Sequence, residues 1–266
     1  MRLTNWPSEC FLHFLSLQVI KMKSFIKDNI LIAFSEASDE DLSFFAFSEE
    51  EALKAWNRLE ITKKYNLSLP KFTFQEHGKS VLKITDPSID VSAIRADALS
   101  TDLPMTTVGV FTADCIPLIL TSNQAAAAAH SGWRGLKLNI AGATIKSMKK
   151  DFAAEPRQLK AYIGPCIQQC CYEVGKELLD SFIEADPSYS NFFKASKSAD
   201  NKYYLDTQGI AKKQLLESGI PLENITILDK CTCCSKDPET GNYNYFSYRR
   251  EKERRKSMFS FAVKLK

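Results

Sequence analysis

The chain has 266 residues, of which 44% are hydrophobic and 25% are charged, and its formal net charge is +3 at pH 7. A chain of this length can bury a full core, as either one large domain or two small ones, and we predict one. Its positive charge is spread along the sequence apart from a basic run near the C-terminus, which is a weak nucleic-acid footprint. We therefore predict neither nucleic-acid nor membrane binding.

The cysteines and the first residues bear on the cellular compartment. Eight cysteines would suit a disulfide framework in a short secreted chain, but this chain is long and lacks a convincing export signal. The apolar segment from Cys10 to Ile20 contains His13 and Gln18 and is followed by lysines. We expect a cytoplasmic protein with reduced thiols, in which residues 1–24 are an N-terminal extension or a misassigned start and residues 25–266 form the domain.

In the first half of the chain, short apolar runs predict strands and one segment has helical spacing. The helix is predicted from Glu49 to Tyr65, with Ser48 as its N-cap. Asp114 and Cys115 fall in the break between two strands. The predicted strands cover residues 29–35, 72–74, 81–84, 107–111 and 116–121.

In the second half, the string HSGWRG (residues 130–135) predicts a strand end, a glycine turn and the start of a helix. A second helix is predicted from Val174 to Ile183, and a third from Asp206 to Ser218, where Gly219 stops it. Further strands are predicted at residues 159–163, 225–228 and 259–263. This alternation indicates mixed α/β layers without defining the strand order.

Two histidines and one cysteine form the constellation most able to carry chemistry. The sequence has only three histidines, and both His77 and His130 stand beside glycine in loop-like contexts. Cys115 is the thiol most plausibly close to them, because all three residues lie at strand ends. Two imidazoles and one thiolate suit zinc, and three protein ligands leave a fourth position for water or substrate.

Two other interpretations of these residues stay open. The ligands are scattered and match no compact zinc-finger pattern, so His77 and His130 could be loop histidines bonded to backbone groups, with Cys115 a small buried residue. Alternatively, Cys115 is a nucleophile and one of the histidines is its base. Metal binding and nucleophilic attack both need the thiolate, so the residues alone do not separate them.

Several longer strings occur together in one order. They are QEHG (75–78), TADCIPLIL (112–120), AAAHSGWRG (127–135), IGPCIQQCCYEVG (163–175) and FSYRRE (246–251). Together they resemble the signature blocks of the YfiH-like laccase-domain family, over a stretch from about Asn57 to the C-terminus. The resemblance implies an α+β fold in which mixed β-sheets are layered with flanking helices in a single domain. It also places His77, Cys115 and His130 on the family's zinc ligands.

The resemblance implies a function as well. The family is described as purine nucleoside phosphorylases that act on adenosine, inosine and methylthioadenosine, with adenosine deamination at the same site. Purine nucleosides and phosphate would then be the ligands of a monomer or homodimer. Copper-dependent oxidation of polyphenols is an alternative that we rank lower, because one thiolate site lacks the several coppers of a multicopper oxidase. A Cys/His thiol hydrolase is a further alternative.

In a deaminase, zinc would lower the pKa of a bound water, and an acid or base would move protons. Asp114 precedes Cys115 and Glu76 precedes His77, so each is a candidate for that role, an orienting group or a surface acid.

Phosphorolysis needs fixed positive charge for the phosphate dianion. Arg134 is our first choice, followed by Arg249 and Arg95. Trp133 and Tyr172 are candidates to stack on a purine, although aromatic residues beside glycine turns more often serve packing.

The remaining cysteines invite a second metal site. Only Cys231 and Cys234 have Cys-x-x-Cys spacing, so the pattern of two zinc knuckles is incomplete. The resemblance implies that Cys166 lines or supports the pocket together with its neighbours Cys170 and Cys171. We predict a structural role for the later group, which comprises Cys231, Cys233 and Cys234.

Overall fold

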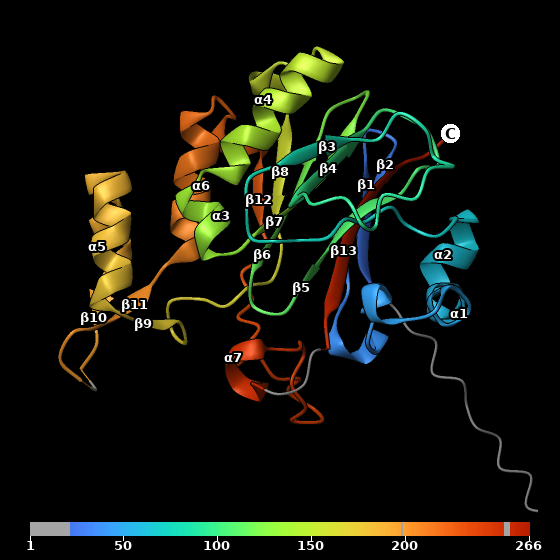
Figure 1. Ribbon diagram of the computed structural model, residues 1–266. Coiled ribbons are helices and arrows are strands. Elements are labelled where there is room, and N and C mark those ends of the chain that lie inside the picture. Colours follow the sequence, from blue (N-terminus) through green and yellow to red (C-terminus); the bar gives the residue numbers. More distant parts are fainter. Residues whose placement is uncertain (1–21, 198, 253–255) are drawn as a thin grey trace, which may run out of the picture.

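Two β-sheets packed face to face form the centre of the molecule (Figure 1). The computed structural model describes residues 22–197, 199–252 and 256–266. The smaller of the two sheets is antiparallel throughout. Its strands, in spatial order, are β1 (Lys23–Lys27), β2 (Ile30–Phe34), β13 (Met258–Lys264) and β5 (Val108–Thr112).

The larger sheet is mixed. Only its two outer pairs, β12 with β8 and β3 with β4, are parallel. Its strands, in spatial order, are β12 (Ile225–Ile227), β8 (Lys160–Ile163), β6 (Ile116–Thr121), β7 (Ala126–Ser131), β4 (Ala98–Thr101) and β3 (Val81–Lys83).

Strand β7 shows how the layers are packed. Its side chains alternate between two faces, as a strand requires. Ala126 and Ala128 belong to the core between the two sheets, whereas Ala127 and Ala129 belong to the core on the outer face. Because alanine is small, the backbone of β7 can lie close to both neighbouring layers. The alanines before His130 therefore form a central strand that carries His130 near its end.

Helices cover the outer faces of both sheets. On the larger sheet lie α3 (Trp133–Lys137), α4 (Ile140–Phe152) and α6 (Thr207–Glu217). On the smaller sheet lie α1 (Glu49–Arg58) and α2 (Glu60–Tyr65). The predicted fold class, layered mixed sheets with flanking helices, is confirmed.

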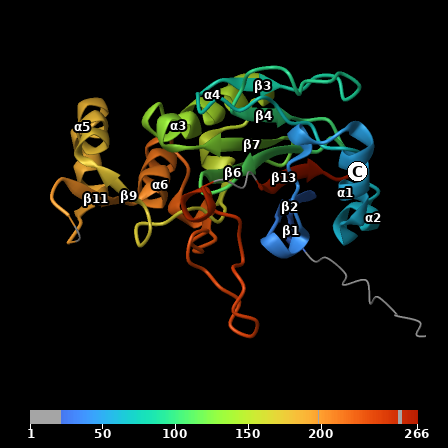
Figure 2. The same cartoon turned by 60° about the horizontal axis from the view of Figure 1, so that its bottom comes forward.

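A third sheet lies at the opposite end of the molecule from α1 and α2 (Figures 1 and 2). It packs with α5 (Lys176–Ala185), and the short helix α7 (Tyr248–Glu251) precedes the last strand of the chain. The strands of this third sheet are β10 (Phe193–Ala195), β11 (Lys202–Leu205) and β9 (Glu173–Gly175).

Three predicted elements differ in the structure. The helix predicted from Glu49 to Tyr65 is two helices, because the buried Leu59 between them has an extended backbone (ψ 129°). Its predicted N-cap is confirmed, since the Ser48 hydroxyl accepts from the Glu51 N–H. The helix predicted after residue 135 is likewise divided, at Asn139, whose backbone is left-handed. Residues 72–74 form no strand: Phe74 makes an isolated bridge with Arg95, and Lys71, just before them, makes one with Val108.

The ends of the other elements agree closely with the prediction. Asp206 caps α6 by accepting from the Gly209 N–H, and Gly219 follows that helix with φ +93°. Val174, predicted to begin a helix, lies instead in β9.

Of the predicted N-terminal extension, residues 1–21 lie outside the described residues, and β1 begins at Lys23. In the part of the chain that the structure describes, no helix is both long and apolar enough to cross a membrane.

Candidate metal centre and adjoining pocket

His77, Cys115 and His130 lie together. Their ligand atoms are all within 4.8 Å of one another, and the two imidazole rings meet edge to face with centroids 4.7 Å apart. Three different segments supply them: the loop before β3, the break between β5 and β6, and the end of β7. The structure therefore brings together the three residues that the sequence singled out, and the metal itself stays a prediction.

Asp97 orients two of these residues, and sequence reasoning missed it. This buried carboxylate lies 2.8 Å from His130 Nδ1, which leaves Nε2 as the ring nitrogen for a metal. It also accepts the backbone N–H groups of His77 at 2.9 Å and Gly78 at 2.6 Å. His77 has a left-handed backbone (φ 64°), and these two hydrogen bonds hold it there. The only signal in the sequence was an acid directly before an apolar strand.

Gly132 is required for the three side chains to approach one another. A Cβ atom there would lie 2.6 Å from His77 Cδ2 and 3.1 Å from Cys115 Sγ. Any side chain would therefore displace two of the three candidate ligands. Gly132, the first glycine of the HSGWRG string, thus makes room for the candidate ligands and also allows the turn.

Electrostatics couples the three groups. Burial acts to raise the pKa of Cys115, but the charge and hydrogen bonds of His130 and His77 outweigh it and lower the pKa to about 6. Burial acts to lower the pKa of His130, but the Cys115 thiolate and Asp97 raise it to about 9. Without a metal, this pair is a thiolate and an imidazolium at neutral pH. A thiolate is the form that a metal ion or an electrophile requires.

The donor set fits a metal ion. Two imidazole nitrogens and one thiolate sulfur are ligands that zinc binds, and three protein ligands leave one position for water or substrate. A His₂Cys set is also used by copper in electron-transfer proteins. The residues therefore indicate a single transition-metal ion and do not by themselves identify the element.

Asp114 supports Cys115 from behind. Its backbone has a positive φ of 95°, and both of its carboxylate oxygens accept hydrogen bonds. The Thr232 hydroxyl donates to one oxygen at 2.6 Å, and the Arg249 backbone N–H donates to the other at 2.6 Å. Of the roles predicted for Asp114, this geometry fits orientation of Cys115 better than proton transfer.

An open pocket of about 480 Å³ lies beside the three ligands. Its lining includes Trp133, which directly follows Gly132, as well as Tyr172 and Arg249. The metal ligands are not themselves part of that lining. The pocket therefore adjoins the metal centre through Trp133 and does not enclose it. Two lysines that the sequence analysis did not single out, Lys137 and Lys202, also line it.

Cations lie over both aromatic rings of this region. The Arg134 guanidinium is 4.3 Å from the Trp133 ring centroid, and that of Arg249 is 5.0 Å from the Tyr172 centroid. Burial raises the pKa of Tyr172 to about 12, and the charge of Cys115 adds to that rise. Tyr172 is therefore in electrostatic range of the metal centre.

Three predicted site residues lie elsewhere. Arg95 is exposed, forms an ion pair with Glu76 at 3.2 Å and covers the Phe74 ring. Neither Arg95 nor Glu76 lines the pocket. Cys166 is fully buried with its sulfur 4.0 Å from the Thr207 hydroxyl, so it packs behind the site.

Layered mixed sheets with an oriented His–Cys–His group define the class to which this chain belongs: α+β proteins with a candidate metal centre at the ends of their strands. The chain belongs to the family described as multi-copper polyphenol oxidoreductase laccase, whose model matches residues 40–264. The resemblance seen in the sequence is thereby confirmed.

Three known proteins are similar to this chain in sequence or in fold. It is 34% identical to a purine nucleoside phosphorylase from Clostridium acetobutylicum over 247 residues, covering 90% of this chain and 94% of that protein. It is 34% identical over 156 residues to an adenosine deaminase from an unknown prokaryotic organism, covering 58% of this chain and 56% of that protein. The crystal structure of the hypothetical protein YfiH from Bacillus licheniformis has the same fold (TM-score 0.79, 23% identity), covering 94% of this chain and 98% of that one.

Proposed function

We propose that this protein is a zinc-dependent purine nucleoside phosphorylase with adenosine deaminase activity at the same site. The observation that carries the proposal is the oriented His–Cys–His group beside a pocket in which Trp133, Tyr172 and Arg249 meet. The chain's similarity to a purine nucleoside phosphorylase and to an adenosine deaminase supports both activities.

The pocket offers what nucleoside recognition needs. Trp133 and Tyr172 pack partly against the outer core and also line the pocket, where an aromatic ring can stack on a purine. Arg249 is held in place because its Nη1 donates to the Glu173 carbonyl at 2.8 Å. Fixed aromatic and cationic groups bind a ligand at a lower entropic cost than mobile ones.

The positive charge around this pocket supports phosphorolysis, because it can bind phosphate. Lys137, Lys202 and Arg249 line it, and Arg134 lies at its edge over Trp133. These side chains hold the phosphate dianion against the sugar. A phosphate oxygen then attacks C1′ of the ribose, the bond from C1′ to N9 breaks, and its electron pair leaves with the purine. The purine takes up the proton that the hydrogen phosphate loses, and the products are the free base and ribose 1-phosphate.

The metal centre would serve both reactions, because a cation beside the pocket attracts the phosphate dianion and also activates water for deamination. His77, Cys115 and His130 would hold the zinc ion, which when bound lowers the pKa of a coordinated water toward neutrality. Asp97 fixes the ring of His130 and the backbone of His77, and Asp114 fixes Cys115. Each ligand is thus oriented before a metal arrives, as efficient metal sites require.

A second candidate function is copper-dependent oxidation of polyphenols. The description of the family names this activity, and the His₂Cys donor set matches the trigonal ligand set of blue copper. In this case the protein would bind copper in preference to zinc and oxidise a phenol without any need for phosphate.

The test uses wild-type protein of known metal content and the Cys115→Ala variant, each incubated with adenosine with and without phosphate. We expect adenine only with phosphate, inosine without it, and neither product from the variant. Cys233→Ala is the matched control, because Cys233 is also half-buried but does not belong to the His–Cys–His group.

Three outcomes would contradict the proposal. Zinc-loaded protein that forms neither product would exclude nucleoside chemistry. Phenol oxidation that depends on copper would favour the second candidate. Activity that survives complete chelation but is lost on alkylation of Cys115 would show a thiol hydrolase.

A further inference from the structure

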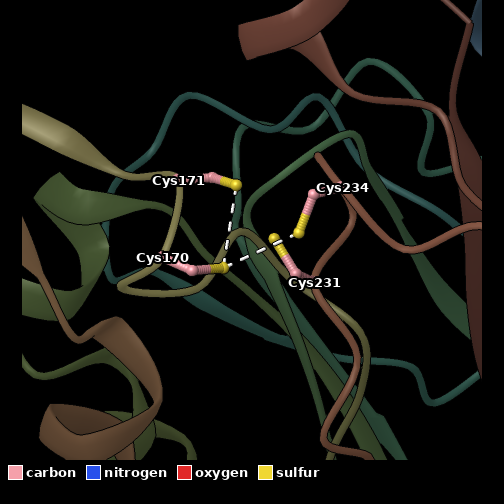
Figure 3. Close-up of side chains that lie close together, drawn as sticks. All are labelled: Cys170, Cys171, Cys231 and Cys234. Carbon is pink, nitrogen blue, oxygen red and sulfur yellow. Dashed lines mark hydrogen bonds between the residues drawn. The ribbon is translucent and has the colours of Figure 1, made fainter.

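Four cysteines form a second group, distinct from the one described above. The side chains of Cys170, Cys171, Cys231 and Cys234 converge, and their four sulfurs all lie within 4.8 Å of one another (Figure 3). The first two come from the loop between β8 and β9, and the other two from the turn that follows β12.

The fold holds these two segments side by side. β8 and β12 are parallel neighbours, and a bridge between Cys166 and Cys231 continues their pairing beyond the strands. The Gln168 side chain donates to the Asp229 carboxylate at 2.6 Å. Arg250 donates to the carbonyls within the second turn, so that its conformation is also fixed. The cysteines therefore meet because of the backbone around them.

The separations between the sulfurs fit one metal ion. Cys170 Sγ is 3.6 Å from Cys171 Sγ and 3.7 Å from Cys234 Sγ. A disulfide would need about 2.0 Å. Four sulfurs at about 2.3 Å from a tetrahedral zinc lie about 3.8 Å apart. A cluster of several irons would hold its cysteines farther apart than this group does.

The backbone around Cys231 is fixed by hydrogen bonds. The Cys231 carbonyl accepts from the Ser235 N–H at 3.0 Å, and the Cys166 carbonyl accepts from the Thr232 N–H at 3.0 Å. These bonds hold the turn that carries Cys231 and Cys234 against the segment that leads to Cys170. Cys231 is buried, whereas Cys170 and Cys234 are exposed, so an ion from solvent can reach the group.

We propose that Cys170, Cys171, Cys231 and Cys234 bind one structural Zn²⁺ ion. Four thiolates complete the tetrahedral coordination of zinc, so no position is left for water or substrate. The ion joins the loop that carries Tyr172 to the turn that carries Thr232. Since Thr232 supports Asp114 beside Cys115, this ion stabilises the wall of the pocket and the rear of the first metal centre together.

The test is the metal content of protein purified under reducing conditions, measured by mass spectrometry of the elements. We expect about two zinc ions per chain in the wild type, and about one in either Cys234→Ser or Cys115→Ser. Cys233→Ser is the matched control, because it lies in the same turn but outside the group, and it should keep both ions.

Cobalt gives a second measurement that needs no variant. Refolding the wild-type chain with Co²⁺ should give the intense sulfur-to-metal absorption of a four-thiolate site in addition to the spectrum of the His–Cys–His site. Chelation should remove it and lower the melting temperature. The proposal is overturned if the wild type holds one metal ion that Cys234→Ser retains, or if Cys170 and Cys234 form a disulfide in the freshly purified, reduced protein.

Discussion

The two groups of candidate metal ligands differ in their donors and in their surroundings. The His77, Cys115 and His130 group has three donors, is oriented by the buried carboxylate of Asp97 and adjoins a pocket. The group of four cysteines has a full set of donors, and none of its members lines that pocket. An incomplete donor set leaves room for a reacting molecule, whereas a complete one only joins segments of the chain. In the functions that we propose, the same metal would serve catalysis at one site and folding at the other.

Removal of Cys115 should have the largest effect. Cys115→Ala deletes one of three ligands, and we expect nucleoside turnover to fall by about a thousandfold or more. Cys234→Ser, in the other group, should lower turnover far less. Steady-state assays on both variants at matched protein concentration would measure the difference. Equal losses would show that the two groups act as one site.

Asp97→Asn should have the next largest effect. The asparagine keeps the size of the side chain but presents an N–H₂ group to the backbone N–H of Gly78 or to His130. We expect the affinity of the first site for zinc to fall by roughly 10- to 100-fold. Competition with a coloured chelator would measure it, and the zinc held by the four cysteines is the internal reference. A loss at both sites would indicate a general folding defect.

The thiols should also differ in reactivity once metals are removed. His130 and His77 lower the pKa of Cys115 to about 6, whereas burial and neighbouring thiols raise the pKa of Cys170 to about 12. Because the thiolate reacts and exists above the pKa, Cys115 should be alkylated at pH 7 at least about tenfold faster than Cys170, although Cys170 is the more exposed.

Peptide mapping after brief alkylation of chelated, reduced protein would measure both rates as pH is varied. The rate at Cys115 should rise through about pH 6 and then level off, whereas the rate at Cys170 should still be rising in alkaline solution. Faster reaction of Cys170 at pH 7 would show that exposure, and not ionisation, controls these thiols.

The first group could be predicted from the sequence and the second could not. His77, Cys115 and His130 occur in strings that resemble one family, and each stands at the end of an apolar run, where loops gather. The four cysteines combine an adjacent pair with a Cys-x-x-Cys pair 60 residues later, which matches no spacing rule. Their meeting depends on β8 and β12 being parallel neighbours, and alternating elements do not define strand order.

The same limit applies to the fold and to the supporting residues. The layers and most elements followed from periodicity, but the breaks at Leu59 and Asn139 are set by tertiary packing and a left-handed residue that periodicity does not reveal. Asp97 was missed because its role depends on pairing between β4 and β7, which brings it to His130. Contacts between distant segments were thus the part that sequence alone did not provide.

The smallest effect we predict concerns the link between the two groups. Thr232 lies in the turn of the second group, yet its hydroxyl donates to Asp114, the residue before Cys115. Thr232→Val keeps the shape and removes that bond, leaving one oxygen of a buried carboxylate unpaired. We expect a loss of about 1–3 kcal/mol in the free energy of unfolding and a few-fold fall in turnover, with both zinc ions retained.

Thr226→Val, at an exposed position of β12, is the control and should change neither the free energy of unfolding nor the turnover. Chemical denaturation and steady-state kinetics on the two variants would measure both effects. A loss of stability without any change in turnover would mean that the turn of the four-cysteine group only stabilises the fold. A fall in both would show that this turn also positions Cys115.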